Sequence, residues 1–463
     1  MREADELPLL AALQRCRDRI GFHMPGHAGG AAFEPWFAEV LPFLDNTEIA
    51  SLDNLNDPVG PVLRAQQKAA KRAGAGETFF VTTGSTTSMK AAMASVVPAG
   101  GRVLLARNVH KSVAHAAAEL DLLPDFLPAK DCRHPLPLPD LPDVPGQQDL
   151  AAVIITAPDY YGHLIDIAAF ADYAHAADAC LIVDAAHGAH LGADPLLKHK
   201  RALAAGADLV IESAHKTLAA LTPGSYLHIA KASIERKRVD PARVLSMLRI
   251  YQTSSPSFLI AASLEYASWL LARDGDRLWR ERTGQIAAFK ADLPAPLTLF
   301  EQAPQDPLRL VIDCARSHVS ARRCEEALTA RGIDIEMMDY RHLVLIVSLW
   351  QPYDHLKRLQ KALNDVMALP ADPADRSGDL SPELFAALLK PPVFVCSPRD
   401  ALFGARRRQR VLPAELAGRI AAEVISPTPP CIPLIWPGER VTAERAALLS
   451  NILPPDRPVD VLE

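Results

Sequence analysis

The sequence has little of what marks nucleic-acid-binding, membrane-spanning or disulfide-stabilised proteins. Its 49 basic and 55 acidic side chains give a formal net charge of −6, so no excess of positive charge favours a nucleic-acid partner. No apolar run is long enough to cross a bilayer and no secretion leader opens the chain, so we expect a cytoplasmic protein without a membrane partner. The seven cysteines lack the spacing of a disulfide framework or a metal site, which predicts reduced thiols and no bound metal.

A lysine just past a short apolar run carries the strongest functional signal. Lys216 closes the segment Ser213-Ala214-His215-Lys216, which follows the apolar residues 209–211. A lysine at the end of a buried strand loses solvation, and a neutral amine can form a Schiff base with an aldehyde cofactor. This chemistry points to pyridoxal phosphate (PLP). A solvated surface charge is the alternative when the lysine is taken alone.

Two further segments supply what such a cofactor needs. Asp184 ends the apolar run 181–183, where a carboxylate is costly unless a cation such as a protonated pyridine nitrogen lies beside it. Gly84, Ser85 and Thr86 lie between an apolar run and a helix-like stretch, and free N–H groups at a helix start, joined by hydroxyls, form a phosphate cradle. An ordinary helix cap is the alternative for this turn. The order of the three segments favours their delivery to one edge of a parallel sheet.

Apolar runs alternate with alanine-rich helical stretches in much of the chain. The predicted buried strands are 103–105, 153–155, 181–183 and 209–211, and the predicted helices are 112–120 and 167–177. This alternation predicts an α/β fold whose mostly parallel sheet is covered on both faces. Further along, strands at 310–312 and 343–347 around a helix at 321–331 predict a smaller α+β domain.

The length of 463 residues and the changes of pattern predict more than one domain. We expect an N-terminal segment at 1–40, a large cofactor-binding domain at 41–270, a small α+β domain at 271–370 and a C-terminal domain at 371–463. A stretch at 370–376 is the expected linker into the last of these.

Several motifs follow one another across nearly the whole chain. They are Gly21-Phe22-His23-Met24-Pro25-Gly26-His27, Leu52-Asp53-Asn54-Leu55, Arg107-Asn108-Val109-His110-Lys111-Ser112, Pro158-Asp159-Tyr160-Tyr161-Gly162, Asp184-Ala185-Ala186-His187-Gly188-Ala189-His190, Ser213-Ala214-His215-Lys216 and Pro429-Pro430-Cys431-Ile432-Pro433-Leu434. In these motifs the chain resembles the bacterial ornithine/lysine/arginine decarboxylases of PLP fold type I, in a short form without the N-terminal wing domain of larger members. The resemblance implies an aspartate aminotransferase-like large domain, PLP as cofactor, and decarboxylation of arginine, lysine or ornithine to an amine and carbon dioxide, as in polyamine biosynthesis.

The resemblance also implies roles for individual residues. Lys216 would form the Schiff base, Asp184 would pair with the pyridine nitrogen, and His110 would stack on the cofactor ring. His187 would lie beside the ring, near the phenolic oxygen. The residues expected to hold or flank the phosphate are Gly84, Ser85, Thr86, Ser213 and His215.

The chain departs from the family pattern in several of these motifs. The departures are Ala28, Asn56, Asp57, Asp159, Ala185 and Cys431. They leave Lys216 and Asp184 in place, so they bear on the substrate more than on the reaction type. The predicted substrate contacts are His23, Asp53, Asp57 and Asp159. The three aspartates are candidates because the cationic end of a basic amino acid needs an acceptor in a closed pocket. Glu423 or Glu439 near the C-terminus is the alternative.

Enzymes of this fold type build their active sites between two subunits, so the resemblance implies a homodimer or a higher oligomer. Ser254 and Ser255 are the expected contacts with the neighbouring subunit's cofactor phosphate, with a serine-rich helix cap as the alternative. Two other functions stay open, because fold alone does not decide the reaction. One is a different PLP-dependent reaction, such as amino transfer, and the other is a non-catalytic role.

Overall fold

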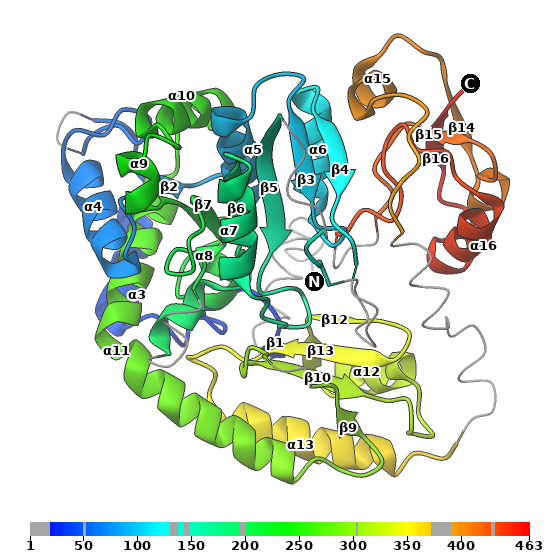
Figure 1. Ribbon diagram of the computed structural model, residues 1–463. Coiled ribbons are helices and arrows are strands. Elements are labelled where there is room, and N and C mark those ends of the chain that lie inside the picture. Colours follow the sequence, from blue (N-terminus) through cyan, green and yellow to red (C-terminus); the bar gives the residue numbers. More distant parts are fainter. Residues whose placement is uncertain are drawn as a thin grey trace, which may run out of the picture.

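The computed structural model describes residues 19–49, 52–129, 138–142, 149–194, 201–301, 304–371, 390–426 and 431–463. Three sheets of three or more strands and one two-stranded pair organise this part of the chain (Figure 1). Most of the predicted linker at 370–376 lies outside the described residues. Within the described ranges, no helix combines the length and the hydropathy that a bilayer crossing requires.

The largest sheet has seven strands in the order β2-β8-β7-β6-β5-β3-β4. Their bounds are Glu77–Val81 (β2), Arg102–Leu105 (β3), Leu123–Phe126 (β4), Leu150–Thr156 (β5), Cys180–Asp184 (β6), Leu209–Glu212 (β7) and Ser225–Ile229 (β8). Strand β8 pairs antiparallel with β2 and β7, and the other neighbours pair in parallel. The prediction of an α/β fold with a mostly parallel sheet is therefore confirmed.

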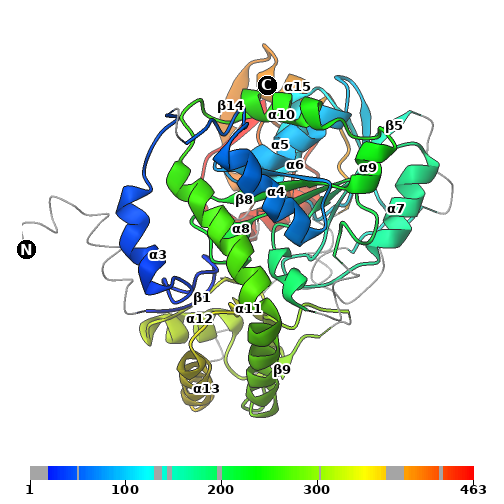
Figure 2. The same ribbon diagram turned by 90° about the vertical axis from the view of Figure 1, so that its left-hand side faces the viewer.

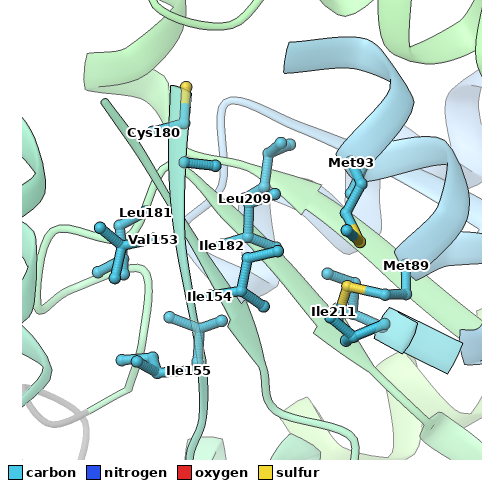
Figure 3. Close-up of a cluster of buried hydrophobic side chains, with 14 of the residues drawn as sticks. Met89, Met93, Val153, Ile154, Ile155, Cys180, Leu181, Ile182, Leu209 and Ile211 are labelled. Atoms are coloured by element: carbon cyan, nitrogen blue, oxygen red, sulfur yellow. The ribbon is translucent and has the colours of Figure 1, made fainter. Parts of the chain in front are cut away.

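The central strands of this sheet are apolar on both faces because both faces are covered. The helices around the sheet are α4 (Pro61–Ala73), α5 (Ser85–Val96), α6 (Lys111–Glu119), α7 (Ile167–Ala176), α9 (Lys231–Glu235) and α10 (Pro241–Tyr251). Figure 3 shows Ile182 on the side of Met89 and Met93 from α5, whereas its neighbour Leu181 lies on the other side. Successive strand residues point to opposite faces, so a continuous apolar run fits a sheet that is buried on both sides.

A long helix leads from this sheet to a second one. Helix α11 (Phe258–Ala291) has 34 residues, and Figures 1 and 2 show it extending from the large sheet to the second unit. The predicted domain boundary at residue 270 falls inside this continuous helix. The second sheet has the order β12-β13-β10-β9, with bounds Thr298–Leu299 (β9), Arg309–Asp313 (β10), Met337–Met338 (β12) and His342–Ile346 (β13).

The second unit also holds the first strand of the described chain. Strand β1 (Ile20–Phe22) pairs in parallel with β11 (Ile333–Ile335), and both contribute to the buried core of this unit. Helices α12 (Ala321–Ala330) and α13 (Tyr353–Met367) pack in the same unit. The short helix α3 (Pro35–Val40) follows β1 and leads back to the large sheet.

The C-terminal part forms a third sheet, which is antiparallel. Its order is β14-β16-β15, with bounds Arg408–Val411 (β14), Ile420–Ala421 (β15) and Val459–Leu462 (β16), and its helices are α15 (Pro398–Phe403) and α16 (Ala443–Ile452). Trp436 is fully buried and meets Phe126 of β4 edge to face, with 5.2 Å between the ring centroids. This contact joins the C-terminal unit to the edge of the large sheet.

Candidate active site

The carboxyl ends of five strands of the large sheet meet around one cavity. Strands β2, β3, β5, β6 and β7 run in the same direction, so the residues that follow them reach the same edge of the sheet. The cavity has a volume of about 210 Å³ and is lined by Thr83, Gly84, Ser85, Thr86, His110, Ser112, Thr156, Tyr160, Asp184, Ala186, His187, Ser213, His215, Lys216 and Pro223. Every residue predicted to be catalytic or cofactor-binding is in this lining.

Lys216 lies in the short helix α8 (Ala214–Thr217), which follows β7. Its Nζ atom is 3.1 Å from Nε2 of His187 and 5.9 Å from the centroid of the Tyr160 ring. Burial lowers the pKa of Lys216, and the negative charges of Asp184 and Glu336 partly offset that effect. A lysine with a lowered pKa at the wall of a cavity is suited to react as a nucleophile.

Asp184 is the last residue of β6 and is buried. Its Oδ1 atom accepts a hydrogen bond from the backbone N–H of Ala186 at 3.1 Å. Burial raises the pKa of Asp184, whereas the positive charge of Lys216 lowers it. A cationic ligand would stabilise the ionised carboxylate in this position, and a protonated ring nitrogen has that charge.

Serine hydroxyls gather where α5 begins. The Oγ atom of Ser85 is 2.5 Å from Oγ of Ser213 and 2.9 Å from Oγ of Ser225. Because the helix starts at Ser85, the backbone N–H groups of Ser85 and Thr86 have no intrahelical acceptor. The Oγ1 atoms of Thr83 and Thr156, which also line the cavity, are buried without a hydrogen-bond partner in the described part of the chain. These donors fit a phosphate ester, so the residues present are suited to PLP.

The half-buried His110 and the buried His215 belong to the cavity wall. His110 precedes α6, and its Nδ1 atom accepts a hydrogen bond from the backbone N–H of Ser112 at 3.1 Å. The Nδ1 atom of His215 is 2.8 Å from the backbone carbonyl of Gly224. Burial lowers the pKa of His110 to about 3 and the pKa of His215 to about 4. Both imidazoles are therefore neutral at pH 7.

Arg309 of β10, which was not predicted from the sequence, reaches the site from the second sheet. Its Nη2 atom is 3.1 Å from Nδ1 of His187, and each residue is only 2% exposed. Burial, together with the positive charges of Lys216 and Arg309, holds the pKa of His187 well below its ordinary value. The sequence did contain a signal, because Arg309 directly precedes the predicted strand 310–312, and a charge buried in a strand needs a partner.

The N-terminal motif packs against the helix that carries the lysine. The N–H of Gly26 donates a hydrogen bond to the carbonyl of His215 at 2.8 Å, and the hydroxyl of Ser348 donates to the carbonyl of Gly26. A Cβ atom at Gly26 would lie 2.6 Å from the backbone carbon of Thr217. A side chain does not fit there, so Gly26 allows the close approach that holds the Lys216 turn in place.

Two of the predicted substrate contacts are engaged elsewhere and lie outside the cavity lining. The carboxylate of Asp53 accepts backbone hydrogen bonds from Gly60 at 2.6 Å and from Val59 at 3.0 Å, ahead of helix α4. Asp57 forms an ion pair with Arg249 at 2.6 Å, and its side chain is 70% exposed. These contacts give both carboxylates a structural role.

The other two predicted substrate contacts also lie outside the cavity lining. Asp159 is buried and accepts two backbone hydrogen bonds within its own turn, at 2.9 Å each, beside the cavity residue Tyr160. His23 is followed by Met24, whose backbone N–H donates to Oε2 of Glu336 at 3.2 Å. Glu336 was not predicted from the sequence, although its negative charge acts on both Lys216 and Tyr160.

The remaining predicted positions fall into three environments. Ser254 and Ser255 are exposed in the turn before α11. The backbone carbonyl of Cys431 accepts a hydrogen bond from Lys111 N at 2.8 Å, which brings the C-terminal motif to the border of the cavity, while residues 427–430 lie outside the described ranges. Glu439 is buried and forms an ion pair with Arg445. Within the described ranges, no group of three or more His, Cys, Asp or Glu side chains is arranged to hold a metal.

Known proteins share this chain's fold and part of its sequence. The chain is similar to the protein YaaO of Bacillus subtilis (strain 168), with 32% identity covering 94% of this chain and 92% of that one. It is similar to the arginine decarboxylase of Bacillus anthracis, with 30% identity covering 98% and 94%. The solved structure of the constitutive lysine decarboxylase of Escherichia coli shares the fold, with a TM-score of 0.76, 21% identity, and coverage of 99% of this chain and 82% of that one.

Family models match two parts of the chain. The model described as the Orn/Lys/Arg decarboxylase major domain matches residues 8–304, and the model described as the C-terminal domain of the same family matches residues 380–453. The first match alone covers more than half of the chain, and it includes every residue of the cavity lining. The chain belongs to the Orn/Lys/Arg decarboxylase family of carboxy-lyases.

Proposed function

We propose that this chain decarboxylates a basic L-amino acid with PLP as its cofactor and releases the corresponding amine and carbon dioxide. The observation that carries the proposal is that Lys216 and Asp184 share one cavity with the hydroxyl-lined start of helix α5. A reactive amine, a buried carboxylate and a phosphate cradle are the three parts that PLP requires. Family membership supports the same reaction.

Each part of the cofactor has matching residues. Lys216 would bind the aldehyde group and Asp184 would pair with the ring nitrogen, while His110 would stack on the ring and His187 would lie near the phenolic oxygen. The phosphate would be held or flanked by Gly84, Ser85, Thr86, Ser213 and His215. When bound, PLP supplies an electron sink for the electron pair left behind as the bond between Cα and the carboxylate breaks.

The protein's own contribution is to hold the protonation states of the groups around the cofactor. The lowered pKa of Lys216 keeps a lone pair available at Nζ for bond formation and, afterwards, for proton transfer. The lowered pKa values of His110 and His187 keep both imidazoles uncharged beside that amine. Ionised Asp184 supplies the negative charge that keeps a ring nitrogen protonated.

Arginine is the first substrate to test among arginine, lysine and ornithine. Support comes from the arginine decarboxylase of Bacillus anthracis at 30% identity, compared with 25% for the constitutive lysine decarboxylase of Escherichia coli. Glu336 is the acceptor we propose for the cationic end, since its charge acts on Lys216 and Tyr160 beside the reaction centre. His23 and Asp159 remain proposed contacts. Asp53 and Asp57 are weaker candidates because their carboxylates have other partners.

The deciding experiment incubates purified protein and added PLP with arginine, lysine or ornithine in turn. We expect carbon dioxide and one amine, and borohydride treatment should attach the pyridoxyl group to a peptide that contains Lys216. A keto acid product would indicate an aminotransferase, which shares this fold: the aspartate aminotransferase of Thermus thermophilus matches with a TM-score of 0.53 and 14% identity. Absence of any product would support a non-catalytic role, and labelling at another lysine would refute the site.

We further propose that the chain works in the cytoplasm as a homodimer or a higher oligomer. The exposed turn with Ser254 and Ser255 lies beside an exposed loop, because Asn56 Nδ2 donates to the backbone carbonyl of Thr253 at 3.0 Å. Val59 and Ile250 are 81% and 68% exposed. Such apolar side chains next to a polar turn suit a subunit interface. A light-scattering mass of one 50.2 kDa chain, with full activity, would contradict the dimer.

A further inference from the structure

Three side chains form a line from the second sheet to the reactive amine. Nη2 of Arg309 is 3.1 Å from Nδ1 of His187, and Nε2 of the same imidazole is 3.1 Å from Nζ of Lys216. Arg309 and His187 are each 2% exposed, so water does not screen the contact between them. The imidazole therefore has one ring nitrogen towards a guanidinium and the other towards an amine.

The chemistry of these groups leaves little choice of proton positions. A guanidinium carries only donors, so Nδ1 of His187 must be the acceptor and must lack a proton. A neutral imidazole has one N–H, which is then on Nε2. This Nε2–H can donate to Nζ of Lys216 only when the amine offers a lone pair, whereas a protonated amine would place two donors against each other.

We infer that Arg309 is a positioning residue that fixes His187 in the Nε2–H tautomer and thereby favours the neutral amine of Lys216. The inference deepens the proposed function, in which that amine must react with the cofactor. It gives a chemical reason for the second sheet to reach the lysine. Neutral Lys216 is favoured by a hydrogen bond as well as by its burial.

Some groups around Lys216 favour its ammonium form and others favour its neutral form. Carboxylates from two elements face it, Asp184 of β6 and Glu336 of the second unit, and both favour the ammonium form. Burial, the largest influence, disfavours the ammonium form, and the charge of Arg309 disfavours it further. The neutral His110 and the rings of Tyr160 and His187 complete the surroundings, with Cys431 acting weakly from the C-terminal motif.

The setting of Arg309 supports a dedicated role. In the described part of the chain, the Nε and Nη1 atoms of Arg309 have no hydrogen-bond partner. The buried guanidinium is therefore held there by the hydrogen bond from Nη2 to His187. The Cβ atom of Arg309 also fits only because residue 162 is a glycine: a Cβ at Gly162, where φ is +83°, would lie 2.6 Å from it. A buried charge with so few partners is costly and is typical of functional positions.

The first test reads the tautomer in the cofactor-free protein. Nitrogen-15 NMR of ring-labelled histidine distinguishes a protonated ring nitrogen from an unprotonated one. In the wild-type protein we expect His187 to have unprotonated Nδ1 and protonated Nε2. Arg309→Gln keeps an N–H donor without the charge and should preserve this tautomer, whereas Arg309→Met should give a mixture. Arg282→Met, a change at another buried arginine, is the matched control and should leave the His187 signals unchanged.

A second test measures the reactivity of the Lys216 amine and needs no enzymatic turnover. Trace labelling of the cofactor-free protein with acetic anhydride at a series of pH values, followed by mass spectrometry of the Lys216 peptide, gives the reactivity of that lysine. We expect Arg309→Met to lower its labelling rate at neutral pH about tenfold, which corresponds to a rise of about one pKa unit, and Arg309→Gln to lower it less. A wild-type His187 protonated at Nδ1, or unchanged labelling in Arg309→Met, would overturn the inference. Because neither readout needs a substrate, a failure of the proposed reaction would be seen separately.

Discussion

The guanidinium of Arg107 donates a hydrogen bond to the backbone carbonyl of Pro433 at 2.5 Å, across 326 residues of sequence. It also donates to the carbonyl of Leu434 at 2.9 Å and to that of Lys390 at 3.1 Å. Arg107 is 2% exposed and lies three positions before His110. The C-terminal unit is thus attached to the segment that carries one of the cavity histidines.

Replacing this arginine tests that attachment. Arg107→Met leaves the carbonyls of Pro433 and Leu434 without their charged donor, so we expect a loss of about 3 kcal/mol in the free energy of unfolding, measured by urea denaturation. The carbonyl of Lys390 still accepts a hydrogen bond from Arg445 at 2.6 Å. Arg410→Met is the control, because Arg410 lies in the same unit but pairs with Asp460 while 76% exposed, and it should change stability by less than about 1 kcal/mol. Equal effects of the two changes would show that the Arg107 contacts are not important for stability.

The close approach of Gly26 to helix α8 gives a second prediction. Gly26→Ala places a methyl group against the backbone of Thr217, so we expect a loss of stability of about 1–3 kcal/mol and slower borohydride-trapped labelling of Lys216 by PLP. Gly284→Ala is the control. Gly284 lies in α11 with no atom near the added methyl, so this change should stabilise the protein by about 0.5–1 kcal/mol. A Gly26→Ala variant as stable as the wild type would refute the steric argument.

The lowered pKa values of two cavity histidines predict how stability depends on pH. In the unfolded chain a histidine binds a proton below about pH 6.5, whereas in the folded cofactor-free protein His110 and His215 do so only below about pH 3 and 4. The unfolded state therefore binds more protons between these limits, and the free energy of unfolding falls as the pH falls. Each histidine contributes a slope of about 1.4 kcal/mol per pH unit in that window.

Urea denaturation between about pH 5 and 6.5 measures this slope, above the range in which most carboxylates titrate. His215→Asn should reduce the slope by the contribution of one histidine. His318→Asn, at an exposed position, should leave it unchanged. If His215→Asn retained the wild-type slope, His215 would not be a buried neutral group.

Glu336 provides the prediction on substrate binding. Glu336→Gln removes the negative charge near Lys216 while retaining the shape, so we expect the KM for the active amino acid to rise about tenfold or more with a smaller change in kcat. Asp57→Asn is the matched control, because Asp57 pairs with Arg249 on the surface, and its constants should be those of the wild type. If Asp57→Asn raised the KM and Glu336→Gln left it unchanged, the recognition site would lie at the loop around Asp57.

The large sheet was largely predictable because its strands carry local signals. The predicted strands 103–105, 153–155, 181–183 and 209–211 each fall inside an observed strand, since a continuous apolar run is typical of a strand buried on both faces. Strand β8 was not predicted. Its sequence includes Ser225 and His228, whose polar groups find partners only in the folded protein.

The site was predictable only where its chemistry is local. Lys216 and Asp184 each follow an apolar run, so their unusual positions are visible in the sequence. Arg309 of the second sheet and Glu336, which lies between β11 and β12, come close to His187 and Met24 through tertiary packing, which no spacing along the chain reveals. Asp53 was predicted as a substrate contact because it is an acidic residue inside a family motif. In the structure its carboxylate accepts a backbone hydrogen bond within its own loop.

The pairing of β1 with β11 has a consequence for how the protein is made. Ile20 pairs with Ile333, so the first described strand leaves the ribosome long before its partner exists. The segment that follows it includes Gly26, which contacts the turn bearing Lys216. Although the strands of the large sheet can assemble earlier during synthesis, the lysine turn acquires its anchored neighbour only after residue 333 has emerged. Most of translation is therefore complete before the reactive amine is fully enclosed.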